Sequence, residues 1–467
     1  QPVTVKAHQN WTALPVRRAD GYSSIEVRRD SVQPTEVPLD VPGRFSRPNL
    51  IELSAYRDWS EVAQTMKPLY DRTRQLEADS PLHAEIERIR ALSDDPAVQA
   101  LAALRLVQDQ VRYVALMMGE GALTPASADE TWRRRFGDCK GKTVLLLALL
   151  DGLGIAADPA AVSVTDGDGM DERLPRISAF DHVLVRATIG DAVYWMDGTR
   201  VGHRTLGDLA PPPLHWALPL NGPDTRLERL NPEPLTEPQS EVTLAIDASA
   251  GLHAPATITG VMTVRSDAAS LLAGQLGLVS SVQKDQYLRL NWATTLGEAT
   301  ITDVGSAYDA ETGVLTLTVA GSVPLRWPSE GLTPPGSTYL AMSSTARPDG
   351  PFASTPFAVI HPAYSLQTVT LKLPDGGQGF RVSGGQFDRT ELGYHVIRTV
   401  DLEGDLVTIR LSMRSMVSEI TSAEADAART ADATRRRDVP RGFSSANYAL
   451  TAADVAAWDA AEPTTES

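Results

Sequence analysis

The chain has almost no sulfur chemistry available to it. Its 467 residues include one cysteine, Cys139, so no disulfide bond can form within the chain. Its eight histidines are scattered from His8 to His395 without metal-ligand spacing, which gives no reason to expect a bound metal. No apolar run is long enough to span a bilayer, and no glycine signature for a dinucleotide or a nucleoside triphosphate is present. We therefore expect no cofactor, no disulfide and no integral membrane segment.

Positive charge is also scarce. The 43 Lys and Arg residues stand against 59 Asp and Glu residues, a formal net charge of -16, which repels nucleic acid and anionic lipid surfaces. One basic run, at 435–437, lies in a tail rich in alanine and aspartate and is interpreted as a solvated helix face. We expect no nucleic-acid partner, and the sequence indicates no particular oligomeric state.

Length and local composition predict several domains. At about 150 residues per domain, the chain is expected to hold about three. Short strands broken by prolines come first, a block of helices followed by strands predicts an α+β domain, and the Pro-rich LNPEPLTEPQ predicts a linker before a mainly antiparallel β domain. An Ala-rich helical tail follows. The predicted parts are 1–56, 57–229, 240–415 and 418–467, with two helices inside the β domain at 267–278 and 282–296.

Within 57–229 the helical signals are strong. DWSEVAQTMKPLYDRTRQLEA has helical spacing, and Pro68 inside it predicts a kink or a break. A glycine-containing loop is expected at 119–130. The apolar run at 144–150 predicts a helix that is buried on most sides, and Gly152 and Gly154 provide its stop signal.

The lone thiol stands where this buried helix is expected to begin. In RRRFGDCKGKT, Asp138 is placed to cap the helix and Cys139 to occupy its first turn. A helix start offers partial positive charge and free N–H groups, which favour a thiolate and can receive an oxyanion. The alternative is that Cys139 is a small buried hydrophobic residue. Lys140 and Lys142 make the helix entry polar, which favours the chemical interpretation.

A hairpin after the helix supplies a base and an orienting group. HVLVRATIGDAVYWMD contains two apolar runs around Gly190 and Asp191, which predicts a two-residue turn. In that register His182 opposes Thr199, and Asp197 lies on the same face as His182, one diagonal step away. A carboxylate at that distance can hydrogen-bond an imidazole. A three-residue loop would send the two side chains to opposite faces.

Other interpretations stay open. A histidine in a strand is more often structural, and Asp197 before a glycine can be a turn former. His203 and His215 are alternative bases, but both lie in a Pro- and Gly-rich segment without a strand pattern. The long segment 206–223 is expected to be a loop that lines or covers a cleft.

Two stretches resemble the core of a known superfamily. YVALMMGEGALTPASADETWRRRFGDCKGKTVLLLALLDGLGIAADPAAVSV, followed by FDHVLVRATIGDAVYWMDGT, resembles the transglutaminase-like superfamily, in which a cysteine begins a helix and histidine and aspartate follow on neighbouring strands. The chain is also similar to bacterial proteins that join an N-terminal DUF3857 domain to this core. LSAYRDWSEVA resembles their connecting segment, so 1–56 looks like the end of a DUF3857-like domain. The implied fold is an α+β papain- or transglutaminase-like core flanked by β segments.

The resemblance implies roles for named residues. Cys139 is the nucleophile, His182 the base and Asp197 the orienting group of a triad that attacks a peptide or carboxamide carbonyl. The oxyanion donors are the Cys139 backbone N–H and one side chain, for which Trp132 and Tyr113 are both candidates. Gly141 stands where an acidic residue is commoner in these proteins, and this departure affects the expected substrate contacts.

The resemblance favours a hydrolytic enzyme, a peptidase or amidase, with a peptide or protein as substrate. One alternative is a transglutaminase that transfers the acyl group to an amine, and another is a non-catalytic binding or scaffold protein with the same fold. The chain begins at Gln1 and not at Met, which leads us to expect a processed protein. The resemblance implies a periplasmic or secreted location.

Overall fold

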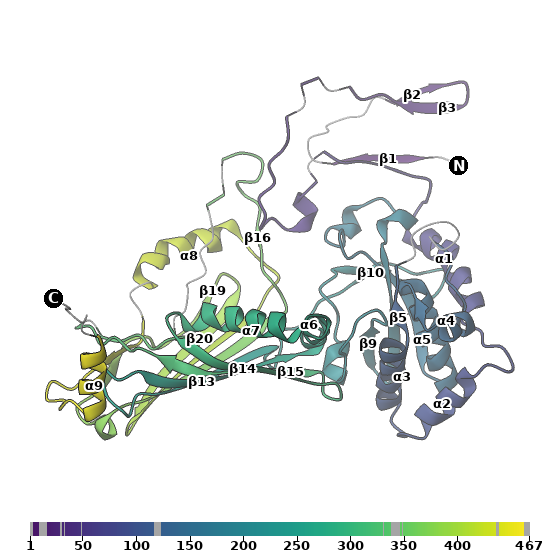
Figure 1. Ribbon diagram of the computed structural model, residues 1–467. Helices are drawn as coiled ribbons and strands as arrows, with labels where there is room; N and C mark the ends of the chain where they lie inside the picture. The colour runs from purple at the N-terminus through teal and green to yellow at the C-terminus, as the bar shows by residue number, and fades with distance from the viewer. Residues whose placement is uncertain are drawn as a thin grey trace. The chain divides into compact units, whose positions relative to one another are not determined.

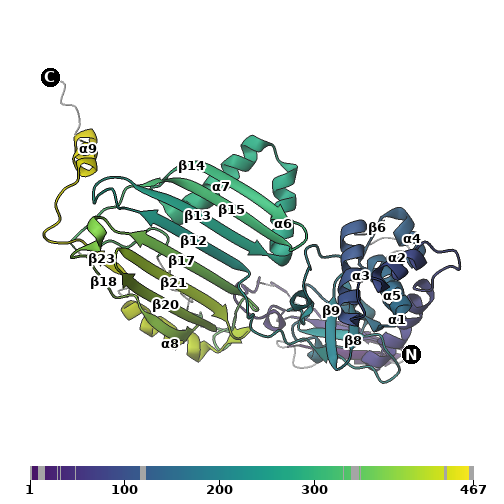
Figure 2. The same cartoon turned by 90° about the horizontal axis from the view of Figure 1, so that it is seen from below.

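The computed structural model describes residues 3–8, 16–28, 30–31, 33–47, 49–115, 123–329, 331–337, 346–347, 349–435 and 439–461. The chain divides into two compact units, Gln1–Glu233 with Asp349–Ala358, and Pro234–Pro348 with Val359–Ser467 (Figures 1 and 2). The first division falls inside the Pro-rich stretch expected to be a linker. Both units combine helices with sheets, in keeping with an α+β protein. Part of the expected loop at 119–130, and Arg436 and Arg437 of the basic run, lie outside the described residues.

The first unit contains helices α1 to α5 and most of the short strands. The helices are α1 (Trp59–Thr73), α2 (Leu82–Arg90), α3 (Pro96–Gln110), α4 (Ala128–Arg134) and α5 (Cys139–Leu153). The strands are β1 (Thr4–Ala7), β2 (Val16–Ala19), β3 (Tyr22–Ile25), β4 (Ile51–Ser54), β5 (Arg112–Tyr113), β6 (Phe136–Gly137), β7 (Ala156–Val162), β8 (His182–Ile189), β9 (Ala192–Met196), β10 (Trp216–Pro219), β11 (Glu228–Arg229) and β16 (Phe357–Ala358).

A five-stranded antiparallel sheet positions the residues of interest. Its strand order is β11-β10-β7-β8-β9, and all neighbouring pairs are antiparallel. In the β8–β9 hairpin, Ile189 pairs with Ala192 and Val185 pairs with Met196. The predicted two-residue turn and the register that follows from it are therefore confirmed. Gly190 in this turn has φ of 59°, which a glycine adopts without strain.

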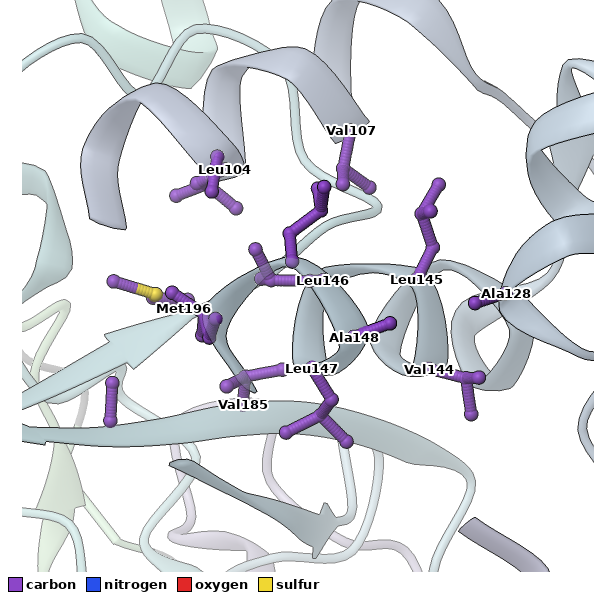
Figure 3. Close-up of a cluster of buried hydrophobic side chains, with 14 of the residues drawn as sticks. Leu104, Val107, Ala128, Val144, Leu145, Leu146, Leu147, Ala148, Val185 and Met196 are labelled. Atoms are coloured by element: carbon purple, nitrogen blue, oxygen red, sulfur yellow. The ribbon is translucent and has the colours of Figure 1, made fainter. Parts of the chain in front are cut away.

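Helix α5 is the centre of the first unit's core. Every residue of its apolar run, 144–150, is at most 2% exposed, as the uninterrupted pattern predicted. The helix packs on α2, α3 and α4 and on strands β7 and β8, and Figure 3 shows its leucines meeting Leu104, Val107 and Val185. Gly154 ends the helix in the left-handed conformation, with φ of 76°. Cys139 is thus the first residue of a helix held firmly on most sides.

Close packing of α5 on α2 gives a stability prediction. A Cβ on Gly152 would overlap Cδ1 of Ile86 and lie 3.1 Å from its Cγ1, and Ile86 is buried. We expect Gly152→Ala to lower the free energy of unfolding of the first unit by about 1–3 kcal/mol, measured by urea denaturation. The control is Gly274→Ala in helix α6 (Ser266–Leu278), where nothing lies within 4 Å of the new Cβ and a small gain in stability is expected. Equal effects of the two changes would contradict this interpretation.

Helix α1 differs from the expectation at Pro68. The helix continues from Trp59 to Thr73 with Pro68 inside it, although a kink or break was predicted. Proline leaves the carbonyl four residues earlier, that of Gln64, without its helical hydrogen bond. Both Gln64 and Pro68 are on the exposed side of the helix, where water can bond that carbonyl. The prediction of a break is therefore wrong.

The second unit is built on one large sheet (Figure 2). Its strands are β12 (Ser240–Asp247), β13 (Ala256–Arg265), β14 (Thr300–Asp309), β15 (Val314–Val323), β17 (Tyr364–Lys372), β18 (Arg381–Ser383), β19 (Phe387–Glu391), β20 (Tyr394–Glu403), β21 (Leu406–Ser415), β22 (Glu419–Ile420) and β23 (Arg441–Phe443), and its helices are α6, α7 (Ser281–Leu296), α8 (Ser422–Arg435) and α9 (Ala452–Ala461). The sheet order is β14-β15-β13-β12-β17-β21-β20-β19. The β12–β17 pair is parallel, while the other neighbouring pairs given for the sheet are antiparallel.

One face of this sheet is buried. Helices α6 and α7 pack on β13, β14 and β15, and Trp292 of α7 is fully buried against the sheet's apolar residues. The region beyond residue 418, expected to be helical, contains α8 and α9 but also the strands β22 and β23. Strand β23 pairs with β18, so part of this region is drawn into β structure. Among the described residues, no helix is both long and apolar enough to cross a membrane.

Candidate active site

Cys139 begins helix α5, as predicted, and Asp138 caps it. The Asp138 carboxylate accepts a hydrogen bond from the Gly141 N–H at 2.9 Å and another from the Lys140 ammonium group. Cys139 is 9% exposed, so the sulfur is largely buried. Its chain neighbours on both sides are charged, and the sulfur therefore sits at a polar helix start and not in a hydrocarbon core.

His182 and Asp197 meet as the hairpin register predicted. His182 is the first residue of β8, and Asp197 directly follows β9. Nε2 of His182 lies 2.9 Å from Oδ2 of Asp197, a hydrogen-bonding distance. The Asp197 carboxylate therefore holds one ring nitrogen and leaves Nδ1 for another partner.

Asp197 is itself fixed by its surroundings. Its Oδ1 accepts hydrogen bonds from the Thr199 backbone N–H at 2.8 Å and from the Thr199 hydroxyl at 2.7 Å. The Gln108 amide, on α3, donates to the Asp197 backbone carbonyl at 2.9 Å. Burial alone would raise the pKa of Asp197, but the hydrogen bonds and the charge of His182 outweigh it and lower that pKa to about 2. The carboxylate is therefore ionised throughout the neutral range.

His182 is held in its protonated form by its two neighbours. Burial alone would lower its pKa, but hydrogen bonds to Asp197 and Cys139, together with their negative charges, raise that pKa to about 10. His182 is thus hydrogen-bonded to Asp197 at 2.9 Å and interacts electrostatically with Cys139.

The two oxyanion candidates lie in different environments. Trp132 is 5% exposed, belongs to the hydrophobic core of the unit and has the Arg135 guanidinium 3.5 Å from its ring centroid. Tyr113 is 45% exposed, and its strand β5 pairs with β6, with Tyr113 opposite Gly137. Burial, then the charges of Cys139 and Asp138, raise the pKa of Tyr113. Tyr113 is therefore the more exposed of the two candidates, and it interacts electrostatically with the sulfur.

Of the two alternative histidines, His215 has a different carboxylate partner. The Asp197 carboxylate already makes a hydrogen bond with the His182 imidazole. Nδ1 of His215 lies instead 3.8 Å from Oδ1 of Asp168. His203 is buried, 7% exposed. A Cβ on Gly141 would lie 3.0 Å from the Thr131 hydroxyl oxygen, so a side chain at this position would meet neighbouring protein atoms and not open space. The departure at Gly141 thus affects packing under the helix start.

The segment 206–223 is more regular than expected. It contains a 3-10 turn at Leu206–Leu209, closed by a capping box between Thr205 and Asp208, and the strand β10, which pairs with β7 in the five-stranded sheet. The prediction of one long loop is therefore wrong. The prolines around WALP made this strand hard to recognise in the sequence. Pro219 is tolerated because it lies at the end of β10.

Two polar groups of the site were not predicted. Gln108 is 5% exposed on helix α3, and an amide that follows the apolar pair Leu106 and Val107 on a largely buried helix is the signal that could have found it. Thr199 follows Asp197 by two residues, the spacing of a carboxylate that caps its own turn. No group of side chains in the described part of the chain could hold a metal ion.

Comparisons with known proteins add little to this geometry. No protein-family model matches the chain, and no curated protein does. The chain is similar to a solved structure from Parabacteroides distasonis ATCC 8503, described as a putative protease, at 12% identity over 95% of this chain and 70% of that chain, with a TM-score of 0.49. It is also similar to one from Cytophaga hutchinsonii, described as a putative cysteine protease, at 19% identity over 30% and 39% of the two chains, with a TM-score of 0.17. Likenesses at these TM-scores carry no argument about this chain.

Proposed function

We propose that the protein is a cysteine-dependent acyl-transfer enzyme that hydrolyses peptide or carboxamide bonds. The observation that carries the proposal is the arrangement in which His182 is hydrogen-bonded to Asp197 at 2.9 Å and interacts electrostatically with Cys139 at the start of α5. A nucleophile, a base within reach of it and a group that orients the base are the three parts that thiol catalysis requires. Cys139 is the nucleophile, His182 the acid and base, and Asp197 the orienting group.

The reaction follows from the protonation states. The Cys139 thiolate adds to the carbonyl carbon, and the tetrahedral intermediate collapses as the C–N bond breaks and the His182 imidazolium protonates the departing amine. The product is a thioester on Cys139. Neutral His182 then takes a proton from water, the hydroxide adds to the thioester, and the C–S bond breaks. Acid is released, and the thiolate and imidazolium are restored.

The oxyanion would be received at the helix start. The first N–H groups of a helix have no partner within the helix, and the Cys139 N–H is the first of α5. The Tyr113 hydroxyl is the proposed second donor. Its raised pKa keeps the phenol protonated at neutral pH, as a hydrogen-bond donor must be. Trp132, packed in the core, is not proposed for this role.

Hydrolysis and amine transfer share the same thioester, so one experiment separates them. The protein is incubated with a glutamine-containing peptide library and a biotinylated amine. The reaction is quenched in acid, and the masses of the protein and the peptides are measured by mass spectrometry. We expect peptide-derived acyl adducts on Cys139 and released hydrolysis products in excess of amine-labelled peptide. Excess amine incorporation would make the enzyme a transglutaminase. No adduct on Cys139 and no product from any peptide would favour a binding or scaffold protein and contradict the proposal.

The wider assignment is also proposed. The resemblance of the motifs around Cys139 and His182 supports membership of the transglutaminase-like superfamily, with a papain-like core at 57–229, the end of a DUF3857-like domain at 1–56, a β domain at 240–415 and a tail at 418–467. The same resemblance supports a periplasmic or secreted location. Fusion of the chain behind a secretion signal, with Cys139 reactivity assayed in the periplasmic fraction, tests whether the folded enzyme is stable there.

A further inference from the structure

A buried lysine lies one helical turn from Cys139, and the mechanism proposed above does not use it. Lys142 is 1% exposed, whereas lysines are almost never fully buried unless they are paired. Its ammonium group donates a hydrogen bond to the backbone carbonyl of Val111. Burial lowers the pKa of Lys142 to about 8, although Asp197 and Asp109 act in the opposite direction. A cation retained in this position lowers stability unless its contacts compensate for the burial.

The stem of Lys142 fills space that two glycines leave beside it. A Cβ on Gly198 would lie 3.4 Å from Cβ of Lys142, and a Cβ on Gly137 would lie 3.7 Å from its Cγ. Gly198 directly follows Asp197, and Gly137 directly precedes the helix cap, Asp138. Lys142 therefore packs between the segment that carries the orienting carboxylate and the segment that leads to the nucleophile.

The hydrogen bond to Val111 reaches a third part of the site. Val111 stands between the end of α3 and the strand β5, and Tyr113 is two residues farther along. The strand β5 has only two residues, so its own ladder with β6 is short. The Lys142 hydrogen bond fastens this segment to α5 from 31 residues away, which fixes the backbone on which the Tyr113 phenol is carried.

The charges that face Lys142 come from two elements. Asp109 lies near the end of α3 and is paired with Arg204 at 2.8 Å. Asp197 follows β9 and is shared between His182 at 2.9 Å and Arg200, whose Nε is 3.6 Å from Oδ2. Asp197 thus interacts with three cationic groups, of which Lys142 is the most deeply buried.

We propose that Lys142 is a positioning residue of the Cys139 site: it tethers the segment that carries Tyr113 and, as a buried cation beside Asp197, weakens the hold of that carboxylate on the His182 proton. The inference rests on the proposed function, because it assigns Lys142 a part in the same reaction. Asp197 favours the imidazolium, yet the imidazolium must give up its proton to the departing amine. A cation that offsets part of the Asp197 charge makes that proton transfer easier.

The first test follows the imidazole itself. In protein labelled with 15N-histidine, the ring nitrogens of His182 should shift in two steps, one near pH 8 when Lys142 loses its charge and one near pH 10 for the imidazole itself. Lys142→Met should lack the lower step and keep the upper one. Lys67→Met, which removes a partly exposed lysine paired with Asp71, should keep both steps. A wild-type titration without a step near pH 8 overturns the proposal even if the Lys142→Met variant fails to fold.

The second test separates this inference from the proposed function. Formation of the thioester on Cys139 at pH 7, followed by mass spectrometry with a peptide from the library experiment, should be about three- to tenfold slower in Lys142→Met than in the wild type, since the imidazolium gives up its proton to the departing amine less readily without the offsetting cation. The two proteins should react alike above about pH 9, where the wild-type lysine is neutral. Equal rates at pH 7 in folded Lys142→Met overturn the role of Lys142 alone. If alkylation of Cys139 by iodoacetamide is instead indifferent to His182→Gln, the proposed function fails, whatever Lys142 does.

Discussion

Replacing His182 with glutamine should reduce acyl transfer at least about 10⁴-fold, because the site loses both the base that activates the thiol and the acid that protonates the departing amine. Cys139→Ala should abolish the acyl-enzyme altogether, since no other thiol exists in the chain. The measurement is product formation together with the intact mass of acid-quenched protein, on a peptide found in the library experiment. Circular dichroism of each variant checks that the fold is retained.

The matched control is a second histidine in the same unit. His215 lies 3.8 Å from Asp168 and has no place in the proposed chemistry, so His215→Gln should leave the rate unchanged. Equal losses in the two glutamine variants would mean that the substitutions act through stability and not through chemistry. An acyl adduct that persists in Cys139→Ala would assign the nucleophile to another residue and end the argument for a thiol enzyme.

The relation of His182 to Asp197 could be predicted because a hairpin leaves little freedom. A two-residue turn at Gly190 fixes which residues face each other, and the period of two along each strand then fixes which side chains share a face. The structure has that register, and the two side chains meet at 2.9 Å. The start of α5 at Cys139 was predictable for a similar reason, because Asp138 is a local helix cap.

Contacts between residues far apart in the chain could not be predicted in this way, because they leave no local pattern in the sequence. Gln108 bonds the Asp197 carbonyl from 89 residues away, and Lys142 reaches Val111 across 31 residues. The choice between Trp132 and Tyr113 has the same character, because it depends on which ring the fold buries. The sequence offered two aromatic residues near Cys139, and only packing places one in the core at 5% exposure and the other at 45%.

The large sheet of the second unit shows where strand patterns fail. The neighbouring central strands β12, SEVTLAID, and β13, ATITGVMTVR, show a recognisable strand pattern, since polar residues alternate with apolar ones along much of each strand. The strands β14 and β19 are the two edges of the sheet. An edge strand has a neighbour on one side only, and TITDVGSAYD and FDRTE carry polar or small residues at positions where a central strand is apolar.

Asp197→Asn should shift the titration of His182 toward neutral pH. The amide keeps the shape of the side chain and can still accept from Nε2, but it carries no charge, so the pKa of His182 should fall from about 10 toward its ordinary value of about 6.5. In the wild type the pKa of His182 is higher in the folded than in the unfolded state, so protonated His182 stabilises the fold. This stabilisation is complete below about pH 6.5 and is lost as the pH rises through about 10. The variant should lose imidazolium-dependent alkylation of Cys139 near neutral pH, measured as the rate against pH.

Asp181→Asn is the matched control for this change. Asp181 precedes His182 in the chain, but its carboxylate accepts from the Val164 N–H at 2.7 Å and the Thr165 hydroxyl at 2.8 Å, and not from the imidazole. The same loss of charge one residue away should therefore leave the upper limb of the pH profile in place. This limb is the change in the alkylation rate near pH 10, where His182 loses its proton. If both variants shift the limb equally, the imidazolium responds to the general negative field of this acidic protein. If Asp197→Asn leaves the limb near pH 10, the carboxylate does not hold the proton on His182, and the orienting role assigned to Asp197 is wrong.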